Sequence, residues 1–432
     1  MANDPRESAK IIEQSGNFRD YLIPLDHPRL HPSDRDARTH SAGVLGNEEI
    51  FLVPVARGWM KNYEDDYRGF TTDGKVVRDL WHHVDAEGPT KAMVDAALKL
   101  QAAATPKERK AFSYSVDARE WRAWSNPEVI VIDAGLRVED MSSELREMLH
   151  GLLKASLSKD GYDKVWTAML MNDFLGDLVH LKKVMNTDSY HFCLFGDPSE
   201  DKPWGFNLFG HHLCLNVFTL SGEVVIGPFF VGAEPNIIDD GPHKGMRVLD
   251  KEEAAGLALM KSFSPEQRTK ATLQGDINDI TGESMVCGRW NPADLRGLGG
   301  AHQDNRVIPF EGLAAKDMSE DQQKSLVELI GIFNELLPDG PKQAFLKRVQ
   351  AHLDQTHFAW IGPVTDDTPF YFRIHSPIVM DEFDHHNGVW LANHLPKKYH
   401  IHTIQRLPNR GDYGIALYEE WLHRDGSEKG KI

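Results

Sequence analysis

The chain has 432 residues and a formal net charge of −17, with ordinary apolar and charged fractions, so it can bury one large core or two smaller ones. This acidity argues against nucleic-acid binding, which needs clustered Lys and Arg, and no apolar run is long enough to span a bilayer. The N-terminal segment lacks the apolar stretch of a signal peptide. The scattered cysteines Cys193, Cys214 and Cys287 fit a reducing compartment. We therefore expect a cytoplasmic protein that binds neither nucleic acid nor a membrane.

Residues 1–135 are predicted to be a leader region. Its alanine-rich stretch 92–104 favours a helix. The apolar run Val129-Ile130-Val131-Ile132 predicts a strand that enters the main body.

Residues 136–235 are predicted to contain two helices followed by a β-meander. The first helix begins at the N-cap Ser142, carries an apolar stripe and stops at Gly161, and the second covers 163–185. Strands follow from residue 190, and Ser221-Gly222 marks a hairpin between 213–220 and 223–231. Residues 236–312 form a connecting segment with a helix over 251–260, another begun by Ser264, and a glycine-rich loop over 288–300.

Residues 313–415 repeat the order of residues 136–235. Helices are expected over 318–336 and 341–353, strands from residue 357, and a last strand over 399–407, before a C-terminal helix or tail over 416–432. The two segments match at a constant offset from His191/His357 to Asn216/Glu382. We therefore predict an α+β protein in which two pseudo-symmetric repeats of helices plus antiparallel sheet form one body.

Five polar residues of these repeats are candidate metal ligands. Side chains alternate along a strand, so His400 and His402 share a face of the last strand. On a predicted strand over 210–217, His212 lies on the polar face, and His211 replaces it if the strand is bulged. The matching position of Asn216 in the second repeat is Glu382. The metal-site candidates are therefore His211, His212, Glu382, His400 and His402.

Other polar and aromatic residues are candidates for substrate contact. Arg406 follows on the ligand face and either binds a substrate carboxylate or pairs with Asp412 or Asp384. Asn216 can position a water or a substrate hydroxyl, and Glu382 can serve as an acid or base. His385, His386 and His394 are expected on a solvated loop. The tryptophans at 204, 360 and 390 belong to the core or to an aromatic pocket wall.

Several short motifs are distributed along the two repeats: Gly196-Asp197-Pro198-Ser199, Pro203-Trp204-Gly205, Gly210-His211-His212-Leu213, Glu382-Phe383-Asp384, His400-Ile401-His402-Thr403, Arg406 and Asp412-Tyr413-Gly414. Together they resemble the motifs of domain-of-unknown-function family 3500, over about residues 110–415. The family consists of uncharacterised bacterial and fungal proteins and implies no reaction. The resemblance supports grouping the five ligand candidates.

The pattern predicts a metal-dependent enzyme that acts on a small organic molecule, aromatic molecules included. Four ligands on an octahedral Fe, Mn or Cu ion leave two open positions, which favours a non-haem oxygenase or oxidase. If three ligands bind, a zinc-dependent hydrolase or lyase is favoured instead. A metal-free acid–base enzyme and a non-catalytic small-molecule-binding protein are the remaining alternatives.

Overall fold

The computed structural model describes residues 17–24, 35–278 and 296–425. Within these residues the chain forms eleven α-helices and one mixed, open sheet of twelve strands, which confirms the predicted α+β class. No described helix has the length and apolarity needed to cross a membrane. Cys287 and most of the predicted loop over 288–300 lie outside the described residues.

The helices lie in the N-terminal third, between groups of strands and, in the case of α12, after the last strand. They are α2 (Ala37–Leu45), α3 (Leu52–Glu64), α4 (Thr90–Ala103), α5 (Pro106–Phe112), α6 (Ser143–Ser156), α7 (Lys159–Leu178), α8 (Asp250–Ser262), α9 (Pro265–Ala271), α10 (Glu320–Phe333), α11 (Asp339–Ala351) and α12 (Ile415–Asp425). The strands are β1 (Ser113–Tyr114), β2 (Leu136–Arg137), β3 (Tyr190–Phe195), β4 (Trp204–Gly210), β5 (Leu213–Leu220), β6 (Glu223–Ala233), β7 (Thr272–Gln274), β8 (Leu313–Ala314), β9 (His357–Ile361), β10 (Tyr371–His375), β11 (Met380–His385) and β12 (Ile401–Arg406).

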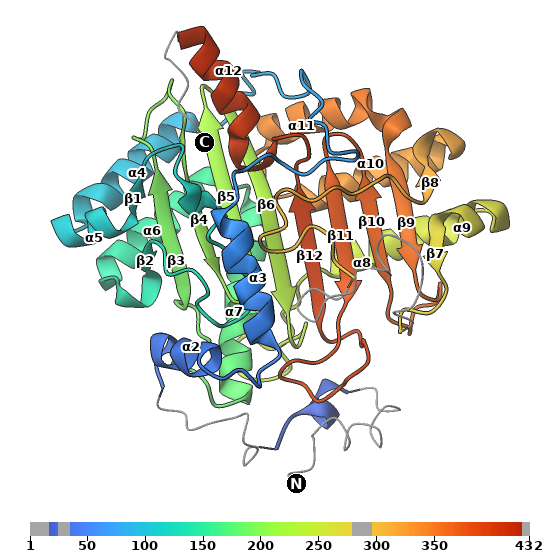
Figure 1. Cartoon of the computed structure of the whole chain (residues 1–432), viewed down its shortest axis with the longest axis horizontal. Helices are drawn as coiled ribbons and strands as arrows, with labels where there is room; N and C mark the ends of the chain where they lie inside the picture. Colours follow the sequence, from blue (N-terminus) through green and yellow to red (C-terminus); the bar gives the residue numbers. More distant parts are fainter. Residues whose placement is uncertain (1–16, 25–34, 279–295, 426–432) are drawn as a thin grey trace.

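The sheet has the order β1-β3-β4-β5-β6-β12-β11-β10-β9-β7, with β2 on β3 and β8 on β9 (Figure 1). The eight central strands are antiparallel, and β1 and β7 pair in parallel at the two edges. The first four long strands therefore meet the last four at the β6–β12 pair. This junction brings segments about 170 residues apart in sequence side by side, as the register of Gly232 with His402 shows.

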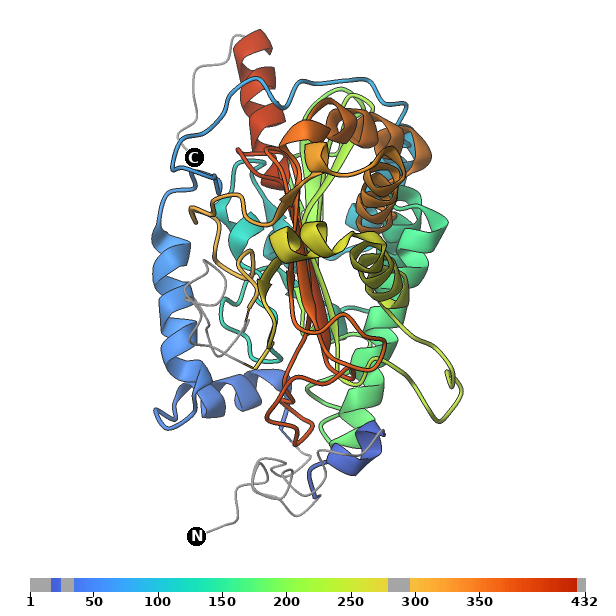
Figure 2. The ribbon, with the colours of Figure 1, turned by 90° about the vertical axis from the view of Figure 1, so that its right-hand side faces the viewer.

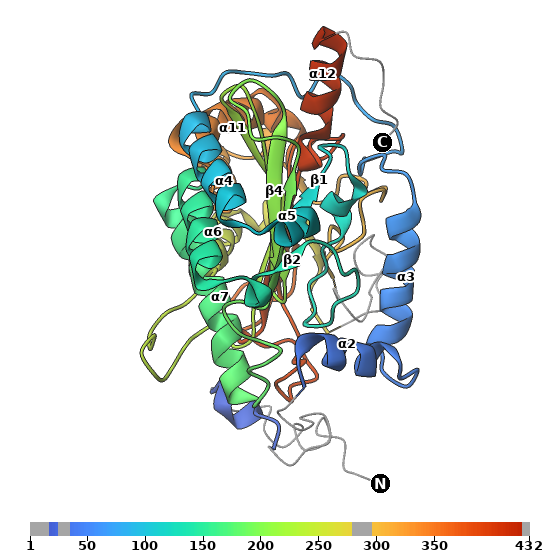
Figure 3. The same cartoon turned by 90° about the vertical axis from the view of Figure 1, so that its left-hand side faces the viewer.

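Both faces of the sheet are covered. Helices α4, α6, α7, α8, α10 and α11 lie on one face, and α3 with irregular segments lies on the other (Figures 2 and 3). Nearly every residue of the central strands is consequently buried. Polar side chains on these strands therefore face protein or a cavity, where an unpaired polar group is costly.

Local hydrogen bonds explain where several helices begin. Ser142 accepts from the Leu145 N–H and caps α6, as predicted. The expected stop at Gly161 is wrong, because Gly161 lies in the first turn of α7, where its N–H donates to the cap Ser158. Helix α7 also ends at Leu178, before the predicted residue 185.

The predicted strand over Val129–Ile132 is wrong. The Ile130 N–H donates to Ser41 Oγ of α2 instead of a neighbouring strand, at 2.9 Å. Val129 and Val131 are nevertheless buried in the core. This apolar run is therefore buried without forming a strand, because a contact with α2 takes the backbone hydrogen bond of Ile130 that a neighbouring strand would otherwise accept.

Candidate metal centre

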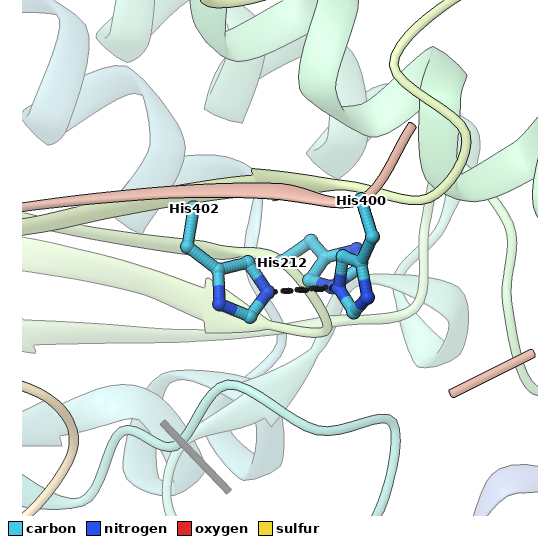
Figure 4. A group of neighbouring side chains, drawn as sticks. All are labelled: His212, His400 and His402. Atoms are coloured by element: carbon cyan, nitrogen blue, oxygen red, sulfur yellow. Dashed lines mark hydrogen bonds between the residues drawn. The ribbon is translucent and has the colours of Figure 1, made fainter. Parts of the chain in front are cut away.

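Three histidines converge on one point on the α3 side of the sheet (Figure 4). The Nε2 atom of His400 lies 3.2 Å from that of His212 and 2.9 Å from that of His402. The remaining pair, His402 and His212, is separated by 3.3 Å. We call these residues the His trio. All three side chains are buried.

His212 reaches the trio from a turn and not from a strand. The predicted strand over 210–217 begins at Leu213, and His211 and His212 form the two-residue turn between β4 and β5. His212 has a positive φ of 57°. Its N–H donates to the Asn126 carbonyl at 3.2 Å, and its own carbonyl accepts from the Gly232 N–H at 2.8 Å. These two bonds hold the unfavourable backbone conformation that aims the ring at β12.

His400 immediately precedes β12 and His402 is its second residue, and the two side chains point to one side, as strand alternation predicts. The His400 Nδ1–H donates to the Asn387 carbonyl at 2.7 Å, so its Nε2 presents a lone pair to the trio. Glu234 supports the preceding loop, since its carboxylate accepts from the N–H groups of residues 389–391.

Burial keeps the His trio neutral. It lowers the pKa of His212 and His402 well below the usual range, and neighbouring histidines lower both further. Burial also lowers the pKa of His400, against the opposing charge of Glu234. Neutral imidazole is the form that binds metal ions.

Asp384 and His386 lie beside the trio. The Asp384 carboxylate is 3.0 Å from His386 Nδ1 and 3.8 Å from His402 Nδ1. Burial raises the pKa of Asp384 to about 7. Asp384, His386 and His402 form a second set whose atoms lie close enough to hold one ion. The prediction of a solvated His385 and His386 is wrong, because His385 ends the buried strand β11 and the loop over 386–400 folds over the sheet and buries His386.

Glu382 lies two residues before Asp384 on β11, outside the trio. Its carboxylate accepts from the N–H groups of Leu298 and Gly299, and from the Tyr371 hydroxyl at 2.6 Å. These bonds use both oxygens to tie residues 298–299 to the sheet. Glu382 and His402 line the same small cavity, but the Glu382 carboxylate does not join the described atoms that lie within 4.8 Å of one another at the trio.

The other predicted site residues are engaged elsewhere. Arg406 donates to Asp412 at 2.7 Å and to Asp304 at 2.6 Å, which matches the ion pair expected as its alternative. Asn216 donates to the Pro228 carbonyl at 2.9 Å. His211 stacks on His212 at 3.9 Å between centroids, and its Nδ1 bonds Asn172 Oδ1. His211 thus packs against the His212 ring and also lines the cavity described below.

A cavity of about 690 Å³ opens onto the His trio. This volume is typical of small-molecule sites. Its walls are mainly apolar and include Leu52 and Trp59 of α3, Leu181, and Trp390. Trp204 and Trp360, the other predicted wall candidates, are instead fully buried in the sheet core.

Four described titratable residues of the cavity wall, Arg35, His40, Glu49 and Glu128, were not found from the sequence. His40 Nε2 lies 3.3 Å from Glu128 Oε1, and both side chains are mostly buried. Burial opposes ionisation of Glu128, but the His40 hydrogen bond and charge outweigh it and lower the pKa of the carboxyl. Both residues belong to the leader region, where no motif or periodic pattern marks them.

A family model described as Protein of unknown function (DUF3500) matches residues 86–415. The chain belongs to this family. The match begins upstream of the region expected from the motifs and includes helices α4 and α5. No curated protein and no solved structure was found to match the chain.

Proposed function

We propose that this protein is a metal-dependent enzyme whose His trio binds one divalent cation beside a substrate cavity. The convergence of three Nε2 atoms carries the proposal. Ligands at about 2.0–2.1 Å from an ion are separated by about 2.9–3.4 Å at octahedral to tetrahedral angles. The measured separations of 2.9, 3.2 and 3.3 Å fall in this range.

Hydrogen bonding alone is a poor explanation of the trio. Each close pair of Nε2 atoms needs one proton between them, yet the Nδ1–H of neutral His400 leaves its Nε2 without one. Protonating the rings is opposed by burial, which lowers all three pKa values. A cation resolves this by accepting all three lone pairs.

The ligand number favours hydrolysis or elimination over oxidation. The preference for Fe, Mn or Cu depended on Glu382 as a fourth ligand, and this carboxylate is used by Leu298, Gly299 and Tyr371. Three histidines with an open position are typical of catalytic zinc, which lowers the pKa of a bound water to about 7. Glu128, held by His40 in the cavity wall, is the candidate proton acceptor. An oxidase remains the rival that metal identity distinguishes.

The proposed substrate is a small organic molecule that occupies the cavity. The tryptophan and aliphatic walls suit an apolar or aromatic body. The described cysteines, Cys193 and Cys214, are buried free thiols, which fits the cytoplasmic setting proposed from the sequence.

We also propose that the two halves of the sheet arose by duplication. Residues that pair across neighbouring strands in the first half have counterparts that pair in the same way in the second half, at the sequence separation of His191 and His357. One set in each half crosses three neighbouring strands: Cys193–Asn207–Asn216 and Ala359–Arg373–Glu382.

The β6–β12 pair is where the two proposed repeats meet. Phe229 and Gln405 hold equivalent places, because they pair with Leu215 and Asp381, and they also pair with each other. A pseudo-two-fold axis would pass between them. Ile378 replaces His212 in the second repeat, so a single metal centre results. An experimental structure in which β3–β6 and β9–β12 fail to superpose would contradict the duplication.

Metal analysis of the purified protein tests the proposed function. We expect about one equivalent of divalent metal in the wild type and a loss of about tenfold or more in affinity in His402→Ala. His243→Ala, which removes an exposed histidine, is the matched control and should retain the metal. Zinc would support a hydrolase or lyase, and iron, copper or manganese an oxidase. Wild-type metal content in His402→Ala would refute the centre.

A further inference from the structure

The His trio uses only one of the two ring nitrogens of His402. The other nitrogen, Nδ1, lies 3.8 Å from Asp384 Oδ1. This separation is too long for a hydrogen bond. Both residues also line a cavity of about 20 Å³, which has room for one water molecule or one ion. A buried carboxylate and a ring nitrogen therefore lie near each other without bonding directly.

The pairing of β11 with β12 fixes this arrangement. Asp384 lies directly opposite His402 in the ladder. The His386 N–H donates to the His400 carbonyl at 2.7 Å, which continues the same register by two residues. Since residues two apart on a strand share a face, Asp384 and His386 lie on the same face as their partners. The rings of His386 and His402 are consequently 4.4 Å apart between centroids.

The separations among Asp384, His386 and His402 suit one ion. Asp384 Oδ2 lies 3.0 Å from His386 Nδ1, and one ligand atom from each of the three residues lies within 4.8 Å of the other two. Ligands at about 2.1 Å from an ion are about 3.0 Å apart at a right angle and at most about 4.2 Å apart. Small rotations of these side chains are therefore enough to bring all three onto one ion.

We propose that Asp384, His386 and Nδ1 of His402 bind a second divalent cation, so that His402 bridges two ions. This inference rests on the proposed function only through His402, which also belongs to the trio. Two imidazoles and one carboxylate suit zinc and other first-row divalent metals. On binding, the His402 Nδ1 proton is released to solvent, and His386 carries its proton on Nε2 so that its Nδ1 presents a lone pair.

The second ion should bind more weakly than the first. Two cations that share one imidazole repel each other, and His402 must lose its remaining ring proton. The purified protein is therefore expected to hold the trio ion, and the second ion binds when metal is added. Its entry path is the large cavity, which His386 and His402 both line.

Titration of the metal-free protein with zinc, in competition with a chromophoric chelator, tests the second site. We expect two equivalents of zinc in the wild type at excess metal, confirmed by metal analysis after unbound zinc is removed. Asp384→Asn keeps the size of the side chain and an acceptor for His386 but removes the negative charge, so one equivalent should be lost. His386→Gln should lose the same equivalent.

Two further variants distinguish this site from the trio. His212→Ala removes a trio ligand that lies outside the second set, and it should retain one equivalent that Asp384→Asn abolishes when the two changes are combined. His243→Ala, which removes an exposed histidine, should bind two equivalents. Thermal unfolding verifies that each variant is folded.

One equivalent of zinc in the wild type at excess metal would overturn the proposal. So would two equivalents in both Asp384→Asn and His386→Gln. A failure of the trio gives a different result, because zinc content would then be unaffected by His212→Ala but would still fall in Asp384→Asn.

Discussion

Two buried glutamates act as acceptors for backbone N–H groups and thereby shape the surroundings of the His trio. Glu234 binds three consecutive N–H groups of the loop that carries Trp390. Glu382 binds the N–H groups of Leu298 and Gly299. A carboxylate suits this task because it is acceptor-only. At both sites the carboxylate holds an irregular segment of the chain against the sheet.

Glu382→Gln should lower stability and leave metal binding intact. The amide places N–H donors against backbone donors, so we expect a loss of about 1.5–3 kcal/mol in the free energy of unfolding. Urea denaturation and metal analysis of the same preparation measure the two effects. Glu234→Gln is the comparison, because it loosens the loop that leads to His400 and should weaken metal binding. Metal loss in Glu382→Gln at unchanged stability would restore Glu382 as a ligand.

The junction of β6 and β12 requires a residue without a side chain beside the trio. A Cβ added to Gly232 would lie 2.6 Å from His402 Cδ2 and 2.7 Å from His212 Cδ2. Its register opposite His402 and its N–H bond to His212 place it between two rings from opposite halves of the chain. The pairing of β6 with β12 and the positions of two trio rings therefore both depend on the absence of a side chain at Gly232.

Gly232→Ala should displace two trio rings and lower metal affinity by about tenfold or more. Gly151→Ala in α6 is the control, since a Cβ there meets nothing within 4 Å. Competition with a chelator measures both affinities. Wild-type affinity in Gly232→Ala would show that the rings need not hold their positions.

The sequence predicted features that depend on neighbouring residues, but not features that depend on contacts between segments distant in sequence. The Ser221–Gly222 hairpin, the Ser142 cap and the His400/His402 alternation are local, and each holds in the structure. The turn at His211 and His212 was missed because its backbone is held by Asn126, which is distant in sequence. His40 and Glu128 were missed for the same reason: only the contact between α2 and the irregular segment around Ile130 brings them together in the cavity wall.

At the scale of the whole molecule, the two-sided covering of the sheet buries histidines that must stay neutral. Burial lowers the pKa of His191 to about 3 and that of His302 to about 4. An unfolded histidine has a pKa of about 6.5, so below this pH the unfolded chain takes up protons that the folded chain refuses. Stability is therefore complete above about pH 6.5 and falls as the pH decreases toward the folded values.

Each such histidine should lower the free energy of unfolding by about 1.4 kcal/mol per pH unit between about pH 6 and pH 4. His191→Gln removes one of these protons from the unfolded state and should reduce the slope by that amount. Urea denaturation at several pH values measures it. Equal slopes for His191→Gln and wild type would show that His191 is protonated in the folded protein.

The central claim is that His212, His400 and His402 bind one ion. A crystal of the metal-loaded protein, with diffraction data collected at the absorption edge of that metal, tests it most directly. We expect one anomalous peak at about 2.0–2.2 Å from all three Nε2 atoms. A peak held by Asp384 and His386 instead, or no peak beside the trio, would contradict it.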